Sequence, residues 1–365
     1  MKGLSDIIGK TFFISFGWGW HFFCNVDSGN IKVNATTSLF KASIKKRSNM
    51  LRSIIFIALL LTSASLLAQN LETAIKQFNK GELKKAKSYL ETVKSKSGDY
   101  EKAQYYLGRI AFDEKEYSDA IDYFKEAVDE NENNADYYAW LGNAYGVYTQ
   151  GVSKIRQGFL APKIKNNYEK SVAIDPQNLD AQLGLIEYYT QAPSIVGGSL
   201  EKALETAKTI LTFNKKEGYL ALSNVYQREE KYKEAEEALI NLVAIDGIYS
   251  TSLGTFYQNR KMFDKAFSHF EKLQISQPEN TNAIYQFGRT SALSGKRPEE
   301  GKKALEKYMT LEIQNGSPSY AAAKMRLAMI YEKSGDKQKA KELYQASLKE
   351  DPNMQLAKDG LKRLR

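Results

Sequence analysis

The feature that most constrains the fold is a 34-residue pattern that recurs along the chain and is clearest between Glu101 and Asn134. Its first half places Leu107 next to Gly108, so a neighbouring helix can approach closely at that point. Its second half puts small and large apolar residues on one face of a helix: Tyr117, Ala120, Phe124 and Ala127. A short polar turn, residues 113–116, separates the halves. The pattern predicts a helix–turn–helix unit.

Copies of this unit follow one another to the C-terminus. The sixth copy is close to complete and contains Leu253, Gly254, Tyr257, Phe263, Ala266, Phe270, Leu273 and Pro278. Two amphipathic helices cannot bury both apolar faces against each other alone, so each unit needs a neighbour stacked on it. The sequence therefore predicts an all-α solenoid, whose length grows by adding units.

This signature of an aromatic residue, Leu-Gly, Tyr, Ala, Phe, Ala and a closing Pro resembles the tetratricopeptide (TPR) repeat. The resemblance covers nearly all of the chain after residue 68, and it implies a right-handed superhelical solenoid of about eight helix pairs. We place the TPR solenoid at 69–354, with units near 69–100, 101–134, 135–178, 179–215, 216–246, 247–280, 281–320 and 321–354. Residues 355–365 form the end of a C-terminal capping helix.

The first 68 residues read differently. Residues 1–49 show neither helical nor strand periodicity, and we expect a disordered or non-native leader. Residues 50–68 follow a basic run and combine a 16-residue apolar stretch with small residues at its end, which is the order of a secretory signal peptide. We expect translation to begin at Met50, cleavage after Ala68 and export to the periplasm or beyond. The alternative is an uncleaved membrane anchor.

Charge and cysteine content narrow the possible partners. The net charge is +9, but the first 68 residues hold eight Lys/Arg and two Asp/Glu, which leaves 44 against 41, a net charge of +3. This balance argues against nucleic acid as a partner. The one cysteine, Cys24, lies in the leader, so the remaining chain has no disulfide and no thiol nucleophile. Membrane contact is expected only through the signal segment.

Residues that could carry catalysis are scarce. His269 is the only histidine after the leader and lies between Phe267 and Phe270, where a structural histidine is the simpler interpretation. The sequence has no phosphate-binding or nucleophile-elbow motif. A zinc site would need more ligands than one histidine and carboxylates supply. We therefore expect no enzymatic activity, no cofactor and no metal.

In TPR proteins the first helix of each pair lines the inner groove, and the resemblance gives a set of groove positions in this chain. Four are our candidates for partner binding as two aromatic–arginine pairs, Tyr105 with Arg109 and Tyr285 with Arg289. The alternative is that both tyrosines pack between helices. Asn143 and Asn224 match part of a carboxylate-binding signature of some TPR domains, without the lysine partners that the signature requires.

The 34-residue register breaks in the third and fourth units, where ten and five residues are added between the two helices of a pair. We predict two loops on one edge. One is a basic loop from Tyr148 to Lys165 that contains Lys154, Arg156, Phe159, Leu160, Lys163 and Lys165. The other is Tyr188 to Ser199, with Pro193, Ile195 and Val196. No proline is expected inside a helix.

The second loop resembles the QAPxIxGG segment of a group of exported bacterial TPR proteins. Pro193 should end a helix, the pair Gly197-Gly198 should allow positive φ, and Ser199 should cap the next helix. The two loops either form one apolar-centred basic contact surface or cover each other as a structural brace.

The sequence thus predicts an exported scaffold or adaptor that binds a protein or peptide partner in the cell envelope without catalysis. The alternative is an accessory protein that binds a glycan or cell-wall polymer through exposed tyrosines. The scaffold function predicts that the protein captures one protein partner. The accessory function predicts that the protein is retained on insoluble cell wall.

Overall fold

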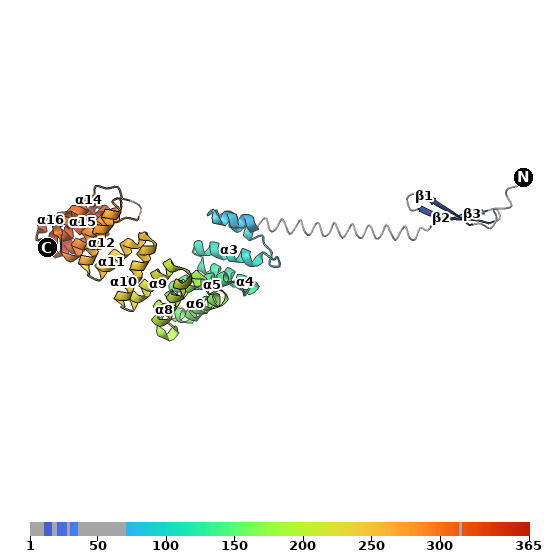
Figure 1. Ribbon diagram of the computed structural model, residues 1–365, viewed down its shortest axis with the longest axis horizontal. Coiled ribbons are helices and arrows are strands. Elements are labelled where there is room, and N and C mark those ends of the chain that lie inside the picture. Colours follow the sequence, from blue (N-terminus) through green and yellow to red (C-terminus); the bar gives the residue numbers. More distant parts are fainter. Residues whose placement is uncertain (1–10, 17–19, 28–29, 36–70, 314–315) are drawn as a thin grey trace. The chain divides into compact units, whose positions relative to one another are not determined.

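The computed structural model describes residues 71–313 and 316–365, together with the backbone of residues 11–16, 20–27 and 30–35. The chain divides into two compact units, with the boundary between Ile110 and Ala111. The predicted signal peptide, residues 50–68, lies outside the described residues. Figure 1 labels the elements along the chain.

The leader contains strands, contrary to the prediction that it has no strand pattern. β1 (Thr11–Phe16), β2 (Trp20–Asp27) and β3 (Asn30–Ala35) form an antiparallel sheet in the order β1-β2-β3. Phe13 pairs with Phe23, and Cys24 pairs with Val33. Aromatic and β-branched residues favour extended backbone, and in β1 and β2 they stand next to one another, which hides the alternation used to recognise a strand. β3 does alternate polar and apolar residues, over only six positions.

From residue 71 onward the described chain is helical, as predicted. In the first unit, residues 71–79 are helical and are followed by α2 (Leu83–Leu90) and the larger part of α3 (Tyr100–Asp113). Phe78 meets the edge of Tyr106 with ring centroids 5.3 Å apart. This contact packs the helix of residues 71–79 against α3.

The second unit continues with helices in pairs and ends in a single helix. These are α4 (Tyr117–Glu130), α5 (Ala135–Gln150), α6 (Lys154–Ile174), α7 (Leu179–Gln191), α8 (Leu200–Phe213), α9 (Lys215–Arg228), α10 (Tyr232–Ile245), α11 (Ser250–Asn259), α12 (Phe263–Ser276), α13 (Thr281–Ser294), α14 (Pro298–Tyr308), α15 (Tyr320–Lys333), α16 (Lys337–Glu350) and α17 (Gln355–Arg363). Two short 3-10 turns, η1 (Ser194–Val196) and η2 (Gly247–Tyr249), lie between helices.

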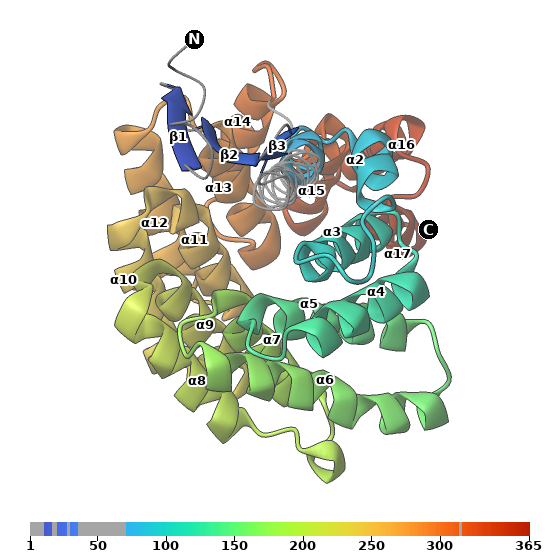
Figure 2. The same cartoon turned by 90° about the vertical axis from the view of Figure 1, so that its right-hand side faces the viewer.

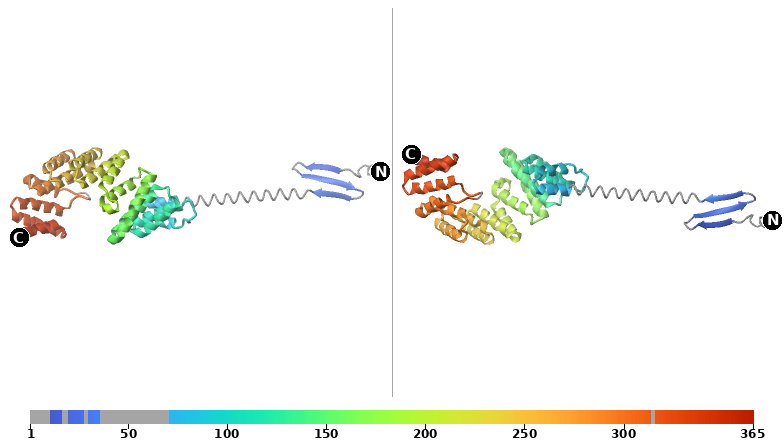
Figure 3. Two further views of the ribbon diagram at one scale, coloured as in Figure 1. Left: turned by 90° about the horizontal axis from the view of Figure 1, so that it is seen from below. Right: turned by 90° about the horizontal axis from the view of Figure 1, so that it is seen from above.

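Within this unit each helix packs on its neighbour in the chain, and first helices also pack on first helices. α5 contacts α6 and α7, and α13 contacts α14 and α15. Figure 3 shows the helix pairs following one another in chain order. The predicted fold class, an all-α solenoid of about eight helix pairs with a capping helix, is confirmed for the described residues from 71 onward, and α17 packs on α16 as the cap.

The same local chemistry starts the first helix of five pairs, α5, α7, α9, α13 and α15. A side-chain oxygen at the N-cap accepts a hydrogen bond from a backbone N–H of the first turn, which satisfies a donor that the helix itself cannot. The N-cap residues are Asn134, Asn178, Asn214, Asn280 and Ser319. These caps explain why the short polar runs between units end one helix and begin the next.

A buried serine ties the two helices of a pair together in the third and eighth units. Ser171 Oγ donates to the Ala135 carbonyl at 2.7 Å, and Ser347 Oγ donates to the Ala321 carbonyl at 2.8 Å. Both serines are fully buried, so their hydroxyls cannot bond to water, and these two hydrogen bonds supply the partners that they need. The recurrence of this bond reflects the recurrence of the repeat.

The third pair departs from the predicted loop. The ten added residues lengthen the helices instead: α5 has 16 residues and α6 has 21, joined by the short turn 151–153. Pro162 consequently lies inside α6, contrary to the expectation that no proline does. Ser153 caps α6, and its side chain accepts from the Arg156 N–H. A helix tolerates an interior proline at a cost of about 3 kcal/mol when other contacts compensate.

Candidate functional site

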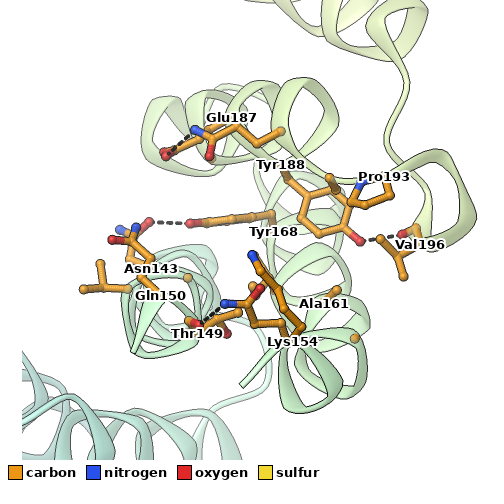
Figure 4. A pocket seen from close by; sticks show the side chains of 18 of the residues that line it. Asn143, Thr149, Gln150, Lys154, Ala161, Tyr168, Glu187, Tyr188, Pro193 and Val196 are labelled. Atoms are coloured by element: carbon orange, nitrogen blue, oxygen red, sulfur yellow. Dashed lines mark hydrogen bonds between the residues drawn. The ribbon is translucent and has the colours of Figure 1, made fainter. Parts of the chain in front are cut away.

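Both additions to the repeat converge on one pocket, which we call the insertion pocket. It has a volume of about 950 Å³. It is bounded by the C-terminal part of α5, the N-terminal part of α6, α7 and the η1 turn, and Phe112 at the end of α3 also lines it. α5, α6 and α7 pack on one another, and α6 contacts η1. Figure 2 shows these helices side by side, and Figure 4 shows the pocket from close by.

Tyr168 forms the floor of the insertion pocket. Its ring lies between two glycines, because an added Cβ would come within 2.7 Å of the ring at Gly142 and within 2.3 Å at Gly184. Its hydroxyl donates to Asn143 Oδ1 at 2.7 Å. Burial, and then the nearby charge of Glu187, raise the pKa of Tyr168 well above its usual value. The phenol therefore stays un-ionised at neutral pH and donates its hydrogen bond to Asn143.

One face of α6 forms a wall. Lys154, Gln157, Gly158, Ala161 and Ile164 line the pocket and recur at helical spacing. Gln157 Nε2 donates to the carbonyls of Thr149, at 3.1 Å, and Val152, at 3.2 Å, which anchors the start of α6 to the end of α5. A Cβ added to Gly158 would meet nothing within 4 Å, so the wall opens onto free space there.

The opposite rim is the η1 turn, and its backbone is firmly held. The Tyr188 hydroxyl donates to the Val196 carbonyl at 2.5 Å. Gly197 has a φ of 98°. At Gly198 a Cβ would lie 1.8 Å from the Ala192 carbonyl oxygen, so only glycine fits.

The three local predictions for this segment agree with the structure. α7 ends at Gln191, two residues before Pro193, and Gly197 adopts positive φ. Ser199 caps α8 by accepting from the Lys202 N–H.

The four predicted basic residues have different surroundings. Arg156 stacks over the Tyr148 ring at 5.4 Å, and Lys163 lies 5.5 Å from the centre of the Tyr145 ring. Lys165 Nζ is 3.8 Å from a Glu169 carboxylate oxygen. Lys154 is the one member of the four that lines the pocket, which also contains Glu187. The insertion pocket thus carries one charge of each sign.

The predicted apolar residues separate into two groups. Leu160 is buried, as the brace alternative requires, whereas Phe159 is 75% exposed and Ile195 is 91% exposed. Pro193, Ile195 and Val196 line the insertion pocket. Large apolar side chains that remain in water around a pocket favour a contact surface over a structural brace.

The groove candidates have different environments. Tyr285 is 5% exposed and contacts the Tyr308 ring, so it is a core residue, and Asn224 is exposed on α9. Arg109 Nη1 donates to the Tyr105 hydroxyl at 2.9 Å. Asn143 lines the insertion pocket, and Arg289 lies on α13. The glycan alternative needed exposed tyrosines, but among the described tyrosines only Tyr89 is classed as exposed.

The lining residues that sequence reasoning missed include Gln157, Gly158, Tyr168, Glu187 and Tyr188. Tyr168 and Glu187 stood at repeat positions, but nothing in the linear pattern says that they face a cavity. Gln157 and Gly158 lay in the segment that we predicted as a loop. The helical spacing of 154, 157, 158 and 161 was the available signal.

The described part of the chain offers neither a metal-binding cluster nor a membrane-spanning helix. No group of three or more His, Cys, Asp or Glu in it could hold a metal ion. Within the described ranges, none of the helices has the length and apolar character that a membrane crossing requires.

Residues 101–134 and 321–354 match the family model of the tetratricopeptide repeat. Both segments are tetratricopeptide repeats. The first is the unit from which the repeat pattern was read, and the second is α15–α16 with the residues that follow it. TPR solenoids are interaction scaffolds, because their stacked pairs form an extended binding surface.

Several solved structures resemble this chain at low identity. A tetratricopeptide repeat protein from Parabacteroides merdae is 15% identical, with 82% of this chain and 98% of that chain covered and a TM-score of 0.44. The C-terminal part of a TPR repeat-containing protein from Cytophaga hutchinsonii is 14% identical, with 80% and 99% covered and a TM-score of 0.45. YrrB, described as a TPR protein with an unusual peptide-binding site, is 20% identical, with 53% and 97% covered and a TM-score of 0.36. No curated protein matches the chain.

Proposed function

We propose that this TPR chain is an exported scaffold that holds a segment of a protein partner in the insertion pocket, without catalysing a reaction. The observation that carries the proposal is that both departures from the 34-residue repeat border the same cavity of about 950 Å³. Stacking brings the two additions to one edge, and there they leave an open cavity between them where a structural brace would fill it. Repeat proteins commonly place their specific binding elements in such additions.

The chemistry of the walls suits an extended peptide. The pocket offers Tyr168 and Tyr188 beside Ala161, Ile164 and Val196, which can receive an apolar side chain. Asn143, Thr149 and Gln150 offer hydrogen-bonding groups to a peptide backbone. The exposed Phe159 and Ile195 extend the apolar contact beyond the cavity. Rigid aromatic groups with nearby polar atoms are typical of protein recognition.

Site-specific photo-crosslinking tests this proposal. A photoreactive amino acid at position 195, on the pocket rim, should crosslink to one partner segment in cell-envelope extract. The matched control is position 248, because Ile248 is also an exposed isoleucine in a 3-10 turn, at 78% exposure, outside the pocket. Equal crosslinking from both positions, or none from 195, would contradict the proposal, and retention on insoluble cell wall would favour the glycan alternative.

Export is proposed on the order of basic, apolar and small residues in 41–68. N-terminal sequencing of the protein purified from its native cells should give Gln69 as the first residue. A product that starts upstream of Met50 would overturn the assignment of the signal peptide.

A further inference from the structure

Arg289 on α13 is a half-buried guanidinium held by neutral groups. Its Nη1 donates to Gln258 Oε1 and to Gln286 Oε1, the latter at 3.3 Å. Burial and then the charge of Arg326 lower the pKa of Arg289. Neither amide compensates the positive charge, so the site holds a cation whose surroundings make its charge unfavourable.

Gln258 on α11 is arranged to orient this guanidinium. It is 2% exposed, and its Nε2 donates to the Gln286 carbonyl at 2.9 Å and to Thr290 Oγ1 at 2.8 Å. With both amide hydrogens used, its oxygen faces Arg289. Such a buried amide is a positioning residue: it determines where the remaining N–H groups of Arg289 point.

Arg326 on α15 is a second guanidinium without adequate acceptors. Its Nε is buried and has no hydrogen-bond partner, and its Nη1 meets only Met329 Sδ, a weak acceptor, at 3.4 Å. α11, α13 and α15 are the first helices of the last three pairs, and α13 packs on both of the others. We call the surface that carries Gln258, Arg289 and Arg326 the first-helix face.

Neither arginine has a carboxylate partner among the described residues. Other charged groups of these pairs are matched: Glu332 on α15 accepts from Arg363 at 2.8 and 2.9 Å, and Arg297 pairs with Glu271 at 2.6 Å. An orphaned buried N–H on a guanidinium costs free energy until an acceptor arrives. A carboxylate supplies that acceptor and the missing negative charge together.

We propose that Arg289 and Arg326 form a carboxylate-binding site on the first-helix face, and that its ligand is an Asp or Glu side chain of a bound peptide. Two guanidinium groups match the two oxygens of such a carboxylate. Nucleic acid is the less suitable ligand, because it requires a broad basic surface and the chain after residue 68 carries a net charge of only +3. The site is separate from the insertion pocket and does not depend on what that pocket binds.

Fluorescence anisotropy with a labelled hexaglutamate peptide, amidated at its C-terminus, tests the site at low ionic strength. The full chain should bind this probe, and the double variant Arg289→Gln/Arg326→Gln should weaken binding at least tenfold. The double variant Arg260→Gln/Arg365→Gln removes the same charge at two exposed positions, one stacked on Tyr232 of α10 and one at the end of the chain, and should leave binding within about twofold. Gln258→Met keeps the net charge and should also weaken binding, because Arg289 loses its orienting amide.

Circular dichroism and the melting temperature of each variant show whether a loss of binding comes from a loss of folding. If the double variant unfolds, Gln258→Met and the two single arginine variants provide the test. Equal weakening by both double variants would show non-specific attraction and overturn the site. No binding of hexaglutamate to the folded wild type would also overturn it. The site would also be overturned if the chain bound hexaglutamate weakly but bound tightly a peptide of Gly and Gln whose only carboxylate is its free C-terminus.

Discussion

Tyr168 shows how one side chain links the packing of the repeat to the candidate site. Its ring fills the space left by the missing side chains of Gly142 and Gly184, so α5, α6 and α7 meet around it. Its hydroxyl then fixes Asn143 at the floor of the pocket. The sequence predicted a close helix approach at the glycine of the Leu-Gly pair, Gly108 in the clearest unit, and Gly142 holds the equivalent position in the next unit. The sequence did not predict the cavity, because the cavity depends on how the faces of α5, α6 and α7 meet and not on the pattern of any one helix.

Gly254 tests the packing in another unit. A Cβ there would lie 2.2 Å from Phe270 Cζ, and Phe270 is fully buried. Gly254→Leu should therefore lower the free energy of unfolding by about 1–3 kcal/mol through overpacking, as measured by denaturant titration. Gly247→Leu is the matched control, because a Cβ at Gly247 meets nothing within 4 Å. Similar losses for both would show that helix contact at Gly254 is not the cause.

His269 gives the fold a specific pH dependence. Its Nε2 lies 2.8 Å from the Ser250 carbonyl, and burial lowers its pKa below the usual value of 6.5. The unfolded chain therefore binds a proton at higher pH than the folded chain does. Stability is full above about pH 6.5 and falls as the pH drops towards the folded pKa.

Unfolding titrations between pH 7 and 5 check this, because the usual carboxyl pKa values lie below that range. The wild type should lose stability across the window, and His269→Gln, which keeps an N–H donor but does not titrate, should show a flatter profile. Parallel profiles for the two proteins would contradict the role of His269.

At the scale of elements, α6 is where sequence and structure differ most. Its 21 residues lack the usual apolar stripe because one face borders the insertion pocket with Gln157 and Gly158, while another exposes Ile155 and Phe159 to water. Periodicity recognises helices that bury one apolar face in a core. The apolar spacing of residues does not identify a helix that lines a cavity. Pro162 also made a loop the simpler interpretation of this segment.

Pro162 provides the test of that helix. An interior proline removes one backbone hydrogen bond and crowds the preceding turn, which costs about 3 kcal/mol in a helix. Pro162 is exposed, so Pro162→Ala should raise the melting temperature by restoring the bond. Pro298→Ala is the control, because Pro298 begins α14, where the missing N–H has no cost. Equal responses of the two variants would favour the predicted loop.

At the scale of the whole molecule, the solenoid was predictable because its information is local and repeated. Each helix is set by its apolar spacing, its cap and its neighbour, and the same pattern returned about eight times. The additions occur only once, so no second copy supports their interpretation. The pocket between the third and fourth pairs could therefore be recognised only in the structure. The strands of the leader also occur once, so no second copy offset the aromatic runs that hide the alternation in β1 and β2.

The most direct test of the account is the affinity of the crosslinked partner segment for two leucine variants on α6. Gly158→Leu adds a side chain where the pocket wall is open, and replacing a helix-interior glycine should keep or raise stability by about 0.5–1 kcal/mol. Asn166→Leu adds the same side chain at an exposed position of α6 that does not line the pocket. We predict that Gly158→Leu raises the dissociation constant at least tenfold while Asn166→Leu leaves it unchanged; an unchanged dissociation constant for a folded Gly158→Leu would contradict the insertion pocket as the partner site.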